Sequence, residues 1–395
     1  MRYLILSDLH IGDGSAKDDF VYDEELSNLL DDFSKEESIT LILNGDTLEL
    51  VESEIVKSLG LIPFEELVEK LDGDLIDSIF ENHPRVLEAF RNFSRKHKII
   101  YVVGNHDYYL LKNERLRERL VELIGNVEVV PYHYIEEIST LVIHGSQFDV
   151  INKFTYDRKT GKLVPPLGDY IVRYMMVNFD EYIEEFVPKK VIRDYDNVRP
   201  LLDVFNWFDH VMEFYNISED ILELWIRNFL NLMRTDIAKN WLKKNYPILR
   251  FSSKLFLNKF GGIKLGEMIV RMTMKLRMLR RTDYLLNVAK KILLGKRRLK
   301  KEDFAGFDDD PPLDLELDGI VMGHIHHSAF EVFPVKGGGY KFYMNCGTWR
   351  PVVERLNGKR GFQKKAELFH GLINLNHKGV EITTSSKNKL EEVIT

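Results

Sequence analysis

The feature that most constrains the fold is a series of short apolar runs, each of which ends abruptly in a small polar cluster. Between these runs the first 145 residues show helical periodicity, as at 84–97 and 114–124. Alternation of this kind predicts a layered α/β protein whose strands end at a common edge. The predicted strands of this part are 3–6, 40–43, 99–103, 127–130 and 140–143.

The middle of the chain has a different pattern. From 150 to 301 long helical periodicity replaces the strand signals, and strand signals return afterwards. We therefore predict a layered α/β core, formed by 1–149 and 319–395, with a large helical insertion at 150–301. The stretch 302–318 has eight acidic residues and no Lys or Arg, which predicts an acidic linker. The later strands are expected at 319–322, 329–333, 340–344, 368–375 and 380–384.

Composition excludes several classes of protein. Hydrophobic residues make up 44% of the chain and charged residues 30%, which is typical of a globular protein. No apolar run reaches the length of about 18 residues that a membrane span requires, and the N-terminus lacks a signal-peptide pattern, so we expect a cytoplasmic protein. The single cysteine, Cys346, excludes an intrachain disulfide and a cysteine-built zinc site.

Candidate metal ligands follow five of the predicted strands. Taken alone, most of these motifs are also explained by a surface turn, a helix cap, a core histidine or a solvated loop, but turn chemistry does not explain the histidine of GNHD at 104–107. Together they place two aspartates, one asparagine and four histidines at the ends of almost purely apolar strands, where ligands of α/β sheets gather. The seven candidates are Asp8, His10, Asp46, Asn105, His144, His324 and His326.

Seven ligands are too many for one tetrahedral ion, so the sequence predicts a two-metal site. Mixed imidazole and carboxylate donors suit manganese, iron or zinc, and manganese is our first choice. Two such ions can bind phosphoryl oxygens and present a hydroxide for in-line attack.

The motif order D-x-H, G-D, G-N-H-D, H-G and G-H-x-H resembles the calcineurin-like metallophosphoesterase superfamily. The resemblance implies an α/β fold in which a two-sheet sandwich is flanked by helices. The resemblance implies that one metal binds Asp8, His10, His326 and a bridging Asp46. It implies that the other metal binds the same bridge with Asn105, His144 and His324. It further implies that His106 acts on the leaving group as a proton donor or charge stabiliser and that Asp107 orients His106.

Two stretches, HGSQFD at 144–149 and YMNCGTW at 343–349, are similar to the branch related to bacterial UDP-2,3-diacylglucosamine pyrophosphatases. This chain has Ser146 and Thr348 where that branch commonly has aspartate, and His106 where its best-known members have arginine.

A basic run lies at the end of the predicted insertion. Between Arg271 and Lys301 there are twelve Lys or Arg and one acid. We expect four of these side chains to bind an anionic, phosphorylated substrate, namely Arg280, Arg281, Arg297 and Arg298. The run also suits peripheral contact with an anionic membrane, nucleic acid or simply solvent; sparse aromatic residues favour a membrane over nucleic acid.

The predicted function is hydrolysis of a phosphoester or pyrophosphate bond by a metal-bridging hydroxide. One alternative is a DNA or RNA nuclease of the same superfamily, in which the basic run contacts nucleic acid. The other is a scaffold that keeps the fold without catalysis, which would be expected to show broken motifs. The oligomeric state is left open by the sequence.

Overall fold

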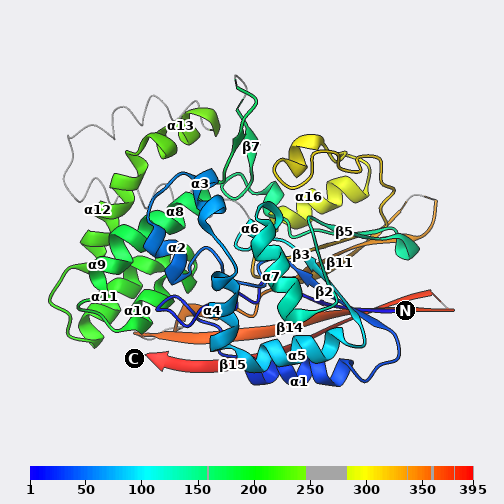
Figure 1. Cartoon of the computed structure of the whole chain (residues 1–395), viewed down its shortest axis with the longest axis horizontal. Coiled ribbons are helices and arrows are strands. Elements are labelled where there is room, and N and C mark those ends of the chain that lie inside the picture. The colour runs from blue at the N-terminus through cyan, green and yellow to red at the C-terminus, as the bar shows by residue number, and fades with distance from the viewer. Residues whose placement is uncertain (158–159, 246–282, 336, 357–359, 378, 395) are drawn as a thin grey trace. The chain divides into compact units, whose positions relative to one another are not determined.

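The computed structural model describes residues 1–395 except 158–159, 246–282, 336, 357–359, 378 and 395 (Figure 1). The chain divides into two compact units. The first consists of Met1–Pro165, Thr282–Pro351 and Ala366–Lys389, and the second of Pro166–Arg281, Val352–Lys365 and Leu390–Thr395.

The first sheet of the first unit has the order β4-β3-β2-β1-β14, and β15 also pairs with β14. Strands β1 to β4 are parallel to their neighbours, whereas β14 is antiparallel to β1, with Leu4 opposite both Leu41 and Leu372. Parallel neighbours place the carboxyl ends of β1, β2 and β3 at one edge. The strands are β1 (Arg2–Leu6), β2 (Ile39–Asn44), β3 (Lys98–Val102), β4 (Val127–Val130), β14 (Phe362–Asn376) and β15 (Gly379–Ile394).

The second sheet of this unit has the order β11-β12-β10-β6-β5. Its three central strands, β12, β10 and β6, are parallel, so their carboxyl ends also share an edge. The strands are β5 (His133–Ile135), β6 (Thr140–Val142), β10 (Gly319–Met322), β11 (Ser328–Pro334) and β12 (Tyr340–Cys346).

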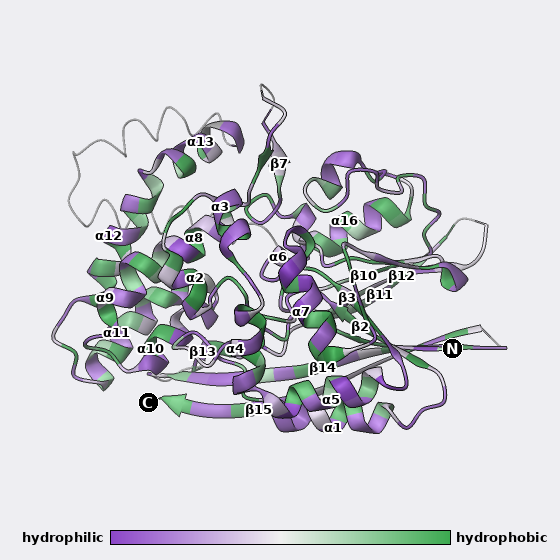
Figure 2. Cartoon of the chain, viewed as in Figure 1, coloured by the Kyte–Doolittle hydropathy of each residue, from purple (hydrophilic) through white to green (hydrophobic). Residues whose placement is uncertain are grey.

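An apolar core lies between these two sheets. Ile5 and Ile42 from the first sheet share one buried cluster with Val142, Val321 and Met344 from the second. In Figure 2 the helices carry hydrophobic and hydrophilic residues together, and β15 is largely hydrophilic. The predicted α/β fold with two sheets and flanking helices is therefore confirmed.

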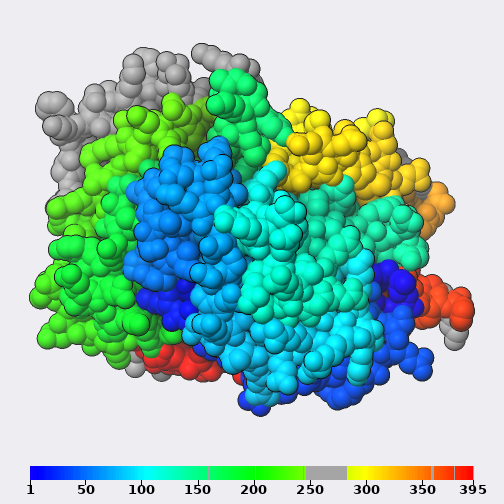
Figure 3. All heavy atoms as spheres, in the orientation of Figure 1, coloured from blue at the N-terminus to red at the C-terminus, as the bar shows by residue number. Residues whose placement is uncertain are grey.

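Helices cover the outer faces of both sheets. Helix α5 packs against β3 and α7 against β4, while the buried stripe of α16, which includes Leu285 and Ala289, packs against the second sheet. Light-blue and cyan atoms, from the part of the chain that contains α3 to α7, lie at the surface on the face shown in Figure 3. The helices of this unit are α1 (Asp23–Phe33), α2 (Glu54–Leu59), α3 (Phe64–Lys70), α4 (Asp74–Asn82), α5 (Pro84–Ser94), α6 (Tyr109–Lys112), α7 (Glu114–Ile124) and α16 (Tyr284–Leu293), with the short helices η1 (Glu136–Ile138), η2 (Ser146–Phe148) and η6 (Lys301–Phe304).

The second unit is mainly helical. Strand β13 pairs with the first residues of β14 and with β9, and Trp207 packs on Phe362 with ring centroids 5.1 Å apart. None of the helices in the described part of the chain combines the length and apolarity needed to cross a bilayer. The elements are α8 (Leu167–Met175), η3 (Met176–Asp180), α9 (Glu181–Ile183), α10 (Lys189–Asp194), η4 (Tyr195–Asn197), β9 (Val198–Arg199), η5 (Leu201–Asp203), α11 (Val204–Phe214), α12 (Ile221–Met233), α13 (Asp236–Asn245) and β13 (Val352–Arg355).

The predicted insertion at 150–301 is divided between the units. Its residues 166–281 lie in the second unit, whereas 150–165 and 282–301 lie in the first. The first of these flanking pieces contains a hairpin that the helical periodicity did not indicate, formed by β7 (Thr155–Tyr156) and β8 (Leu163–Val164).

Candidate metal centre

All seven predicted ligands follow strands of the first unit, and the structure brings six of them together. Asp8 and His10 follow β1, Asp46 follows β2, Asn105 follows β3, His144 follows β6, and His324 and His326 follow β10. Six of the seven, all except the asparagine, fall into two groups whose ligand atoms lie within 4.8 Å of one another: Asp8, His10 and His326, and Asp46, His144 and His324. The ends of the two sheets therefore meet at one site.

In the first group, the ligand atoms face one another. Nε2 of His326 lies 3.3 Å from Nε2 of His10 and 3.3 Å from Oδ1 of Asp8. The other nitrogen of His10, Nδ1, lies 2.8 Å from Oε2 of Glu49. If Nδ1 donates its proton to that carboxylate, Nε2 of the neutral ring presents a lone pair toward the group. If Nε2 of His326 is also unprotonated, three acceptors face one another, and a cation would fit between them.

In the second group, formed by Asp46, His144 and His324, ligand atoms also face one another. Nδ1 of His144 donates to the carbonyl oxygen of Asn44 at 3.0 Å, and its Nε2 lies 3.1 Å from Oδ2 of Asp46 without a hydrogen bond. Two acceptors that face each other in a buried site need a proton or a metal between them. Burial alone would lower the pKa of His144, but the nearby carboxylates raise it to about 9. Oδ1 of Asn105 is also buried without a hydrogen-bond partner among the described residues.

Asp46 lies close to both groups. Burial alone would raise its pKa, but the positive charges of His144, His106 and His10 hold the pKa well below its usual range. Its Oδ1 accepts a hydrogen bond from the backbone N–H of His106 at 2.8 Å. A carboxylate in this position suits a bridge between two cations, and the set of oxygen and nitrogen donors fits manganese, iron or zinc.

Three motif glycines permit the close approach of the ligands. A Cβ atom would lie 2.3 Å from His144 Nδ1 at Gly45, 2.1 Å from Asp46 Oδ1 at Gly104 and 2.3 Å from Asp8 Oδ2 at Gly323. Each distance is far shorter than a van der Waals contact. The glycines of the G-D, G-N-H-D and G-H-x-H motifs are thus required by the ligands that pack on them.

The backbone at the site is left-handed. Of the described residues other than glycine, seven have a φ in the left-handed region, and five of them are predicted ligands. Each such residue costs on the order of 1–3 kcal/mol, and strain of this kind clusters at functional sites. Backbone hydrogen bonds hold the conformation, as from the N–H of Asp8 to Gly45 O at 3.0 Å and from the N–H of His10 to Asp46 O at 2.9 Å. The five are Asp8, His10, Asp46, His324 and His326, with φ between 51° and 70°.

His106 lies beside the groups, and its partner is Glu49. Nδ1 of His106 is 2.7 Å from Oε1 of Glu49. Burial alone would lower the pKa of His106, but the charges of Glu49 and Asp46 raise it to about 10. Burial alone would raise the pKa of Glu49. The charge of His106 and hydrogen bonds from both histidines instead hold this pKa below its usual range. The ring of His106 is thus fixed through Nδ1, which leaves Nε2 for chemistry.

The expected orientation of His106 by Asp107 is not what the structure shows. The carboxylate of Asp107 accepts from the N–H of Gly104 at 2.5 Å, the N–H of Thr47 at 2.8 Å and the hydroxyl of Tyr101 at 2.7 Å. Consecutive side chains diverge here, so Asp107 ties the loop after β3 to the loop after β2. Burial and the charge of Asp46 raise the pKa of Asp107 to about 6.

Two further carboxylates contact the site histidines, and sequence reasoning missed both. Glu49 is bound to His10 and His106, and Oδ2 of Asp149 lies 3.3 Å from Nε2 of His324. A signal for Glu49 was present, because it stands between Leu48 and Leu50 in an apolar run, and a carboxylate in such a run is rarely buried unless paired. Asp149 is the last residue of the HGSQFD stretch at 144–149, but that resemblance gave it no role.

Thr348 and Ser146, which stand where the pyrophosphatase branch commonly has aspartate, have different surroundings. Thr348 donates its hydroxyl to the backbone oxygen of Asp8 at 2.8 Å and accepts from the N–H of Arg350 at 2.9 Å. It therefore supports the left-handed backbone at Asp8. The hydroxyl oxygen of Ser146 is buried without a hydrogen-bond partner among the described residues.

The basic run contacts the loop after His144. An added Cβ at Gly145 would lie 2.9 Å from Leu285 of α16, so this helix packs directly on the H-G motif. Arg297 pairs with Asp303 at 2.5 Å and lies over the ring of Phe148 at 5.0 Å, while Arg298 is exposed. The other two predicted substrate-binding residues lie outside the described residues: Arg280 and Arg281.

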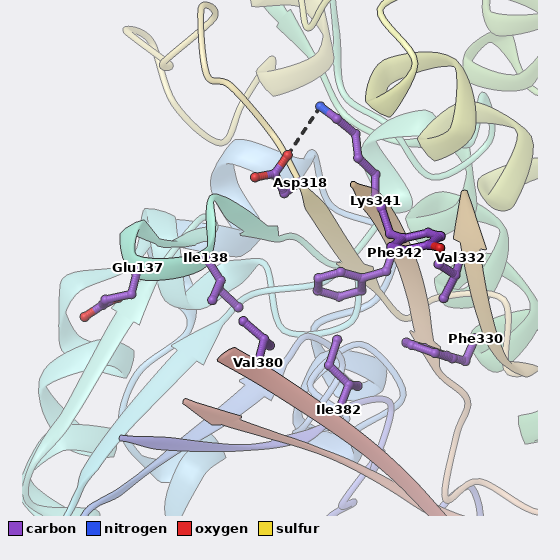
Figure 4. Close-up of a pocket in the computed structure, with 10 residues that line it drawn as sticks. Glu137, Ile138, Asp318, Phe330, Val332, Lys341, Phe342, Val380 and Ile382 are labelled. Atoms are coloured by element: carbon purple, nitrogen blue, oxygen red, sulfur yellow. Dashed lines mark ion pairs between the residues drawn. The ribbon is translucent and has the colours of Figure 1, made fainter. Parts of the chain in front are cut away.

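A separate groove lies between the second sheet and β15 (Figure 4). Its volume is about 470 Å³. Phe330, Phe342 and Ile382 line it, and Lys341 pairs with Asp318 at its rim at 3.5 Å. None of its lining residues is a predicted ligand.

Comparison with known proteins supports the predicted resemblance over part of the chain. Residues 1–169 match the family model of the calcineurin-like phosphoesterases. No curated protein matches the sequence. Among solved structures, wild-type Vps29 of Entamoeba histolytica complexed with Zn²⁺ matches at 11% identity and a TM-score of 0.23, covering 98% of this chain and 99% of that chain. A single mutant of the same protein matches at 11% identity and a TM-score of 0.23, covering 98% and 100%. TM-scores of this size support no conclusion about this chain.

Four of the five motifs fall inside the family match, and the fifth, G-H-x-H at 323–326, lies beyond it. The structure nevertheless places His324 and His326 in the same two groups as the ligands from the matched residues. Over residues 1–169 the chain is therefore similar to the calcineurin-like phosphoesterases, and the last motif completes the site.

Proposed function

We propose that this protein is a metal-dependent hydrolase of phosphoester or phosphoanhydride bonds. The observation that carries the proposal is the convergence of six oxygen and nitrogen donors, from four strand ends, on one site. Strained backbone at five of these residues supports a functional role, because strain without a function is rarely retained. The family match over 1–169 supports the same class of reaction.

We assign the donors to two cations. Asp8, His10 and His326 would hold one cation, Asn105, His144 and His324 the other, and Asp46 would bridge them. Two divalent cations held in this way would neutralise phosphoryl oxygens and lower the pKa of a water molecule; manganese is the preferred ion, with iron and zinc as alternatives.

The remaining chemistry falls to His106. Glu49 occupies Nδ1 of this ring, so Nε2 is the nitrogen that donates a proton to the leaving group or stabilises its charge. The backbone N–H of His106 also binds Asp46 Oδ1 at 2.8 Å, which fixes the position of His106 relative to the bridging carboxylate.

The basic surface beside the site suits a phosphorylated, anionic substrate. Arg298, Lys296 and Lys300 are exposed on the segment that follows α16, which itself packs on Gly145 next to His144. Positive potential there would attract anions, and screening by salt would weaken the attraction. We extend the proposal to a cytoplasmic protein whose basic segment contacts anionic membranes, with vesicle flotation as its test.

A hydrolysis screen of the manganese-loaded protein tests the proposed function. The substrates are phosphomonoesters, phosphodiesters, nucleoside diphosphate lipids and single-stranded DNA, and Asp46→Asn is compared with the exposed control Asp314→Asn. We expect one preferred class, abolished by Asp46→Asn alone. Preference for DNA would favour a nuclease, and two bound ions without hydrolysis of any substrate would favour a scaffold.

A further inference from the structure

A buried cluster of charged side chains lies behind His10 and His106. Arg350, which follows β12, is only 7% exposed in its side chain, and three carboxylates surround its guanidinium. Its Nε lies 2.8 Å from Oδ2 of Asp19, one terminal nitrogen 2.8 Å from Oε2 of Glu52, and the other 3.8 Å from Oε2 of Glu49. Nothing in the motif pattern singles out this arginine.

Glu49 divides its two oxygens between the two histidines. Oε2 is 2.8 Å from Nδ1 of His10, and Oε1 is 2.7 Å from Nδ1 of His106. Oε1 also accepts a hydrogen bond from the backbone N–H of Glu52 at 3.1 Å. Rotation of this one carboxylate would therefore misplace both rings together.

Arg350 restrains that rotation from the far side. Its planar guanidinium is held by Asp19 and by the side chain of Glu52, whose backbone N–H already binds Glu49. Buried charges of this kind are little screened, and lysine lacks the rigid fork that can contact three carboxylates at once. The arginine thus adds an ion pair at 3.8 Å to the hydrogen bonds that hold the Glu49 carboxylate.

We propose that Arg350 is a positioning residue that acts through Glu49 on His10 and His106 together. It thereby couples the geometry of one cation site to that of the proton donor. The part of this inference that concerns catalysis rests on the proposed function. The part that concerns metal binding depends only on the geometry of His10.

The test uses the full chain with the substitution Arg350→Lys. Titration of the metal-free protein with Mn²⁺ should show one ion bound about 10–100-fold more weakly and the other unchanged, as is typical when a carboxylate behind a metal-binding histidine is disturbed. With aryl phosphates, kcat should fall most for poor leaving groups while KM changes little. Wild-type Mn²⁺ affinity, or an equal loss for all leaving groups, would overturn the proposal.

Arg119→Lys is the matched control, because Arg119 makes a similar pair with Asp77 at 2.7 Å on the surface of α7, and it should leave both readouts unchanged. Should Arg350→Lys fail to fold, Asp19→Asn removes support from the arginine without touching Glu49 and is expected to show the same pattern. If the wild type binds two Mn²⁺ ions but hydrolyses no substrate, the proposed function fails while the Mn²⁺ titration still decides the role of Arg350.

Discussion

Replacing Gly104 by alanine should disable the site without disturbing the fold. An added Cβ would lie 2.1 Å from Oδ1 and 2.7 Å from the backbone nitrogen of Asp46, so rotation of one side chain cannot relieve the clash. The bridging carboxylate must move by about 1 Å, and a misplacement of that size costs about 10²-fold in rate. Gly104 itself has no left-handed φ, so backbone strain does not contribute. We expect about 100-fold lower turnover and loss of metal from the bridged site.

The assay combines three measurements on Gly104→Ala: kcat/KM with a chromogenic phosphate ester, metal content per chain, and the midpoint of thermal unfolding. Gly73→Ala is the control, because its added Cβ would meet only the flexible side chain of Arg119, at 3.0 Å. Wild-type turnover with two bound ions in Gly104→Ala would refute the argument that Asp46 packs on this glycine for function.

Three other predictions concern protonation, the proton donor and the metals. His83 lies between Asp18 at 3.0 Å and Asp23 at 2.9 Å; burial alone would lower its pKa, but these carboxylates raise it to about 9. Because this value is above that of the unfolded chain, the stabilisation is complete below about pH 6.5 and is lost as the pH rises toward 9, by up to about 3 kcal/mol. Urea unfolding across this range should show the slope, and His83→Gln should flatten it. His106→Ala should keep both ions and lose about 10²–10⁴-fold in turnover, less with a very good leaving group, whereas loss of an ion would show that it is a ligand. Protein purified without chelator should carry two transition ions per chain, and EDTA should abolish turnover until Mn²⁺ is restored; a single ion beside Asp46 would contradict the two-metal site.

The apolar runs predicted the strands because burial on both faces leaves an unmistakable pattern. The first run, predicted at 3–6, is β1 at Arg2–Leu6, and the run at 319–322 matches β10. The position of the ligands followed from the same pattern, since parallel strands end together. The hairpin of β7 and β8 was not predicted, because each of its strands has only two residues and so shows no periodicity.

The supporting contacts of the site were harder to predict, because they depend on side-chain directions that local sequence does not encode. Asp107 follows His106 directly in the chain, yet Glu49, far away in sequence, is the residue that binds its ring. Arg350 likewise lies about three hundred residues from Glu49 in the chain. The left-handed φ values of Asp8 and His10 could not be predicted from the sequence either, because neither residue type requires them.

The ligands extend from residue 8 to residue 326, and this spread has a consequence for synthesis on the ribosome. At about 5–20 residues per second, roughly 15–60 s pass between the emergence of Asp8 and that of His326. During this interval no nascent chain can complete the first cation site. The strand that pairs with the other edge of β1, β14, emerges later still. Until then the growing polypeptide exposes an apolar strand edge and an incomplete set of metal donors, so the first unit cannot complete its sheet or its first cation site before these late segments emerge.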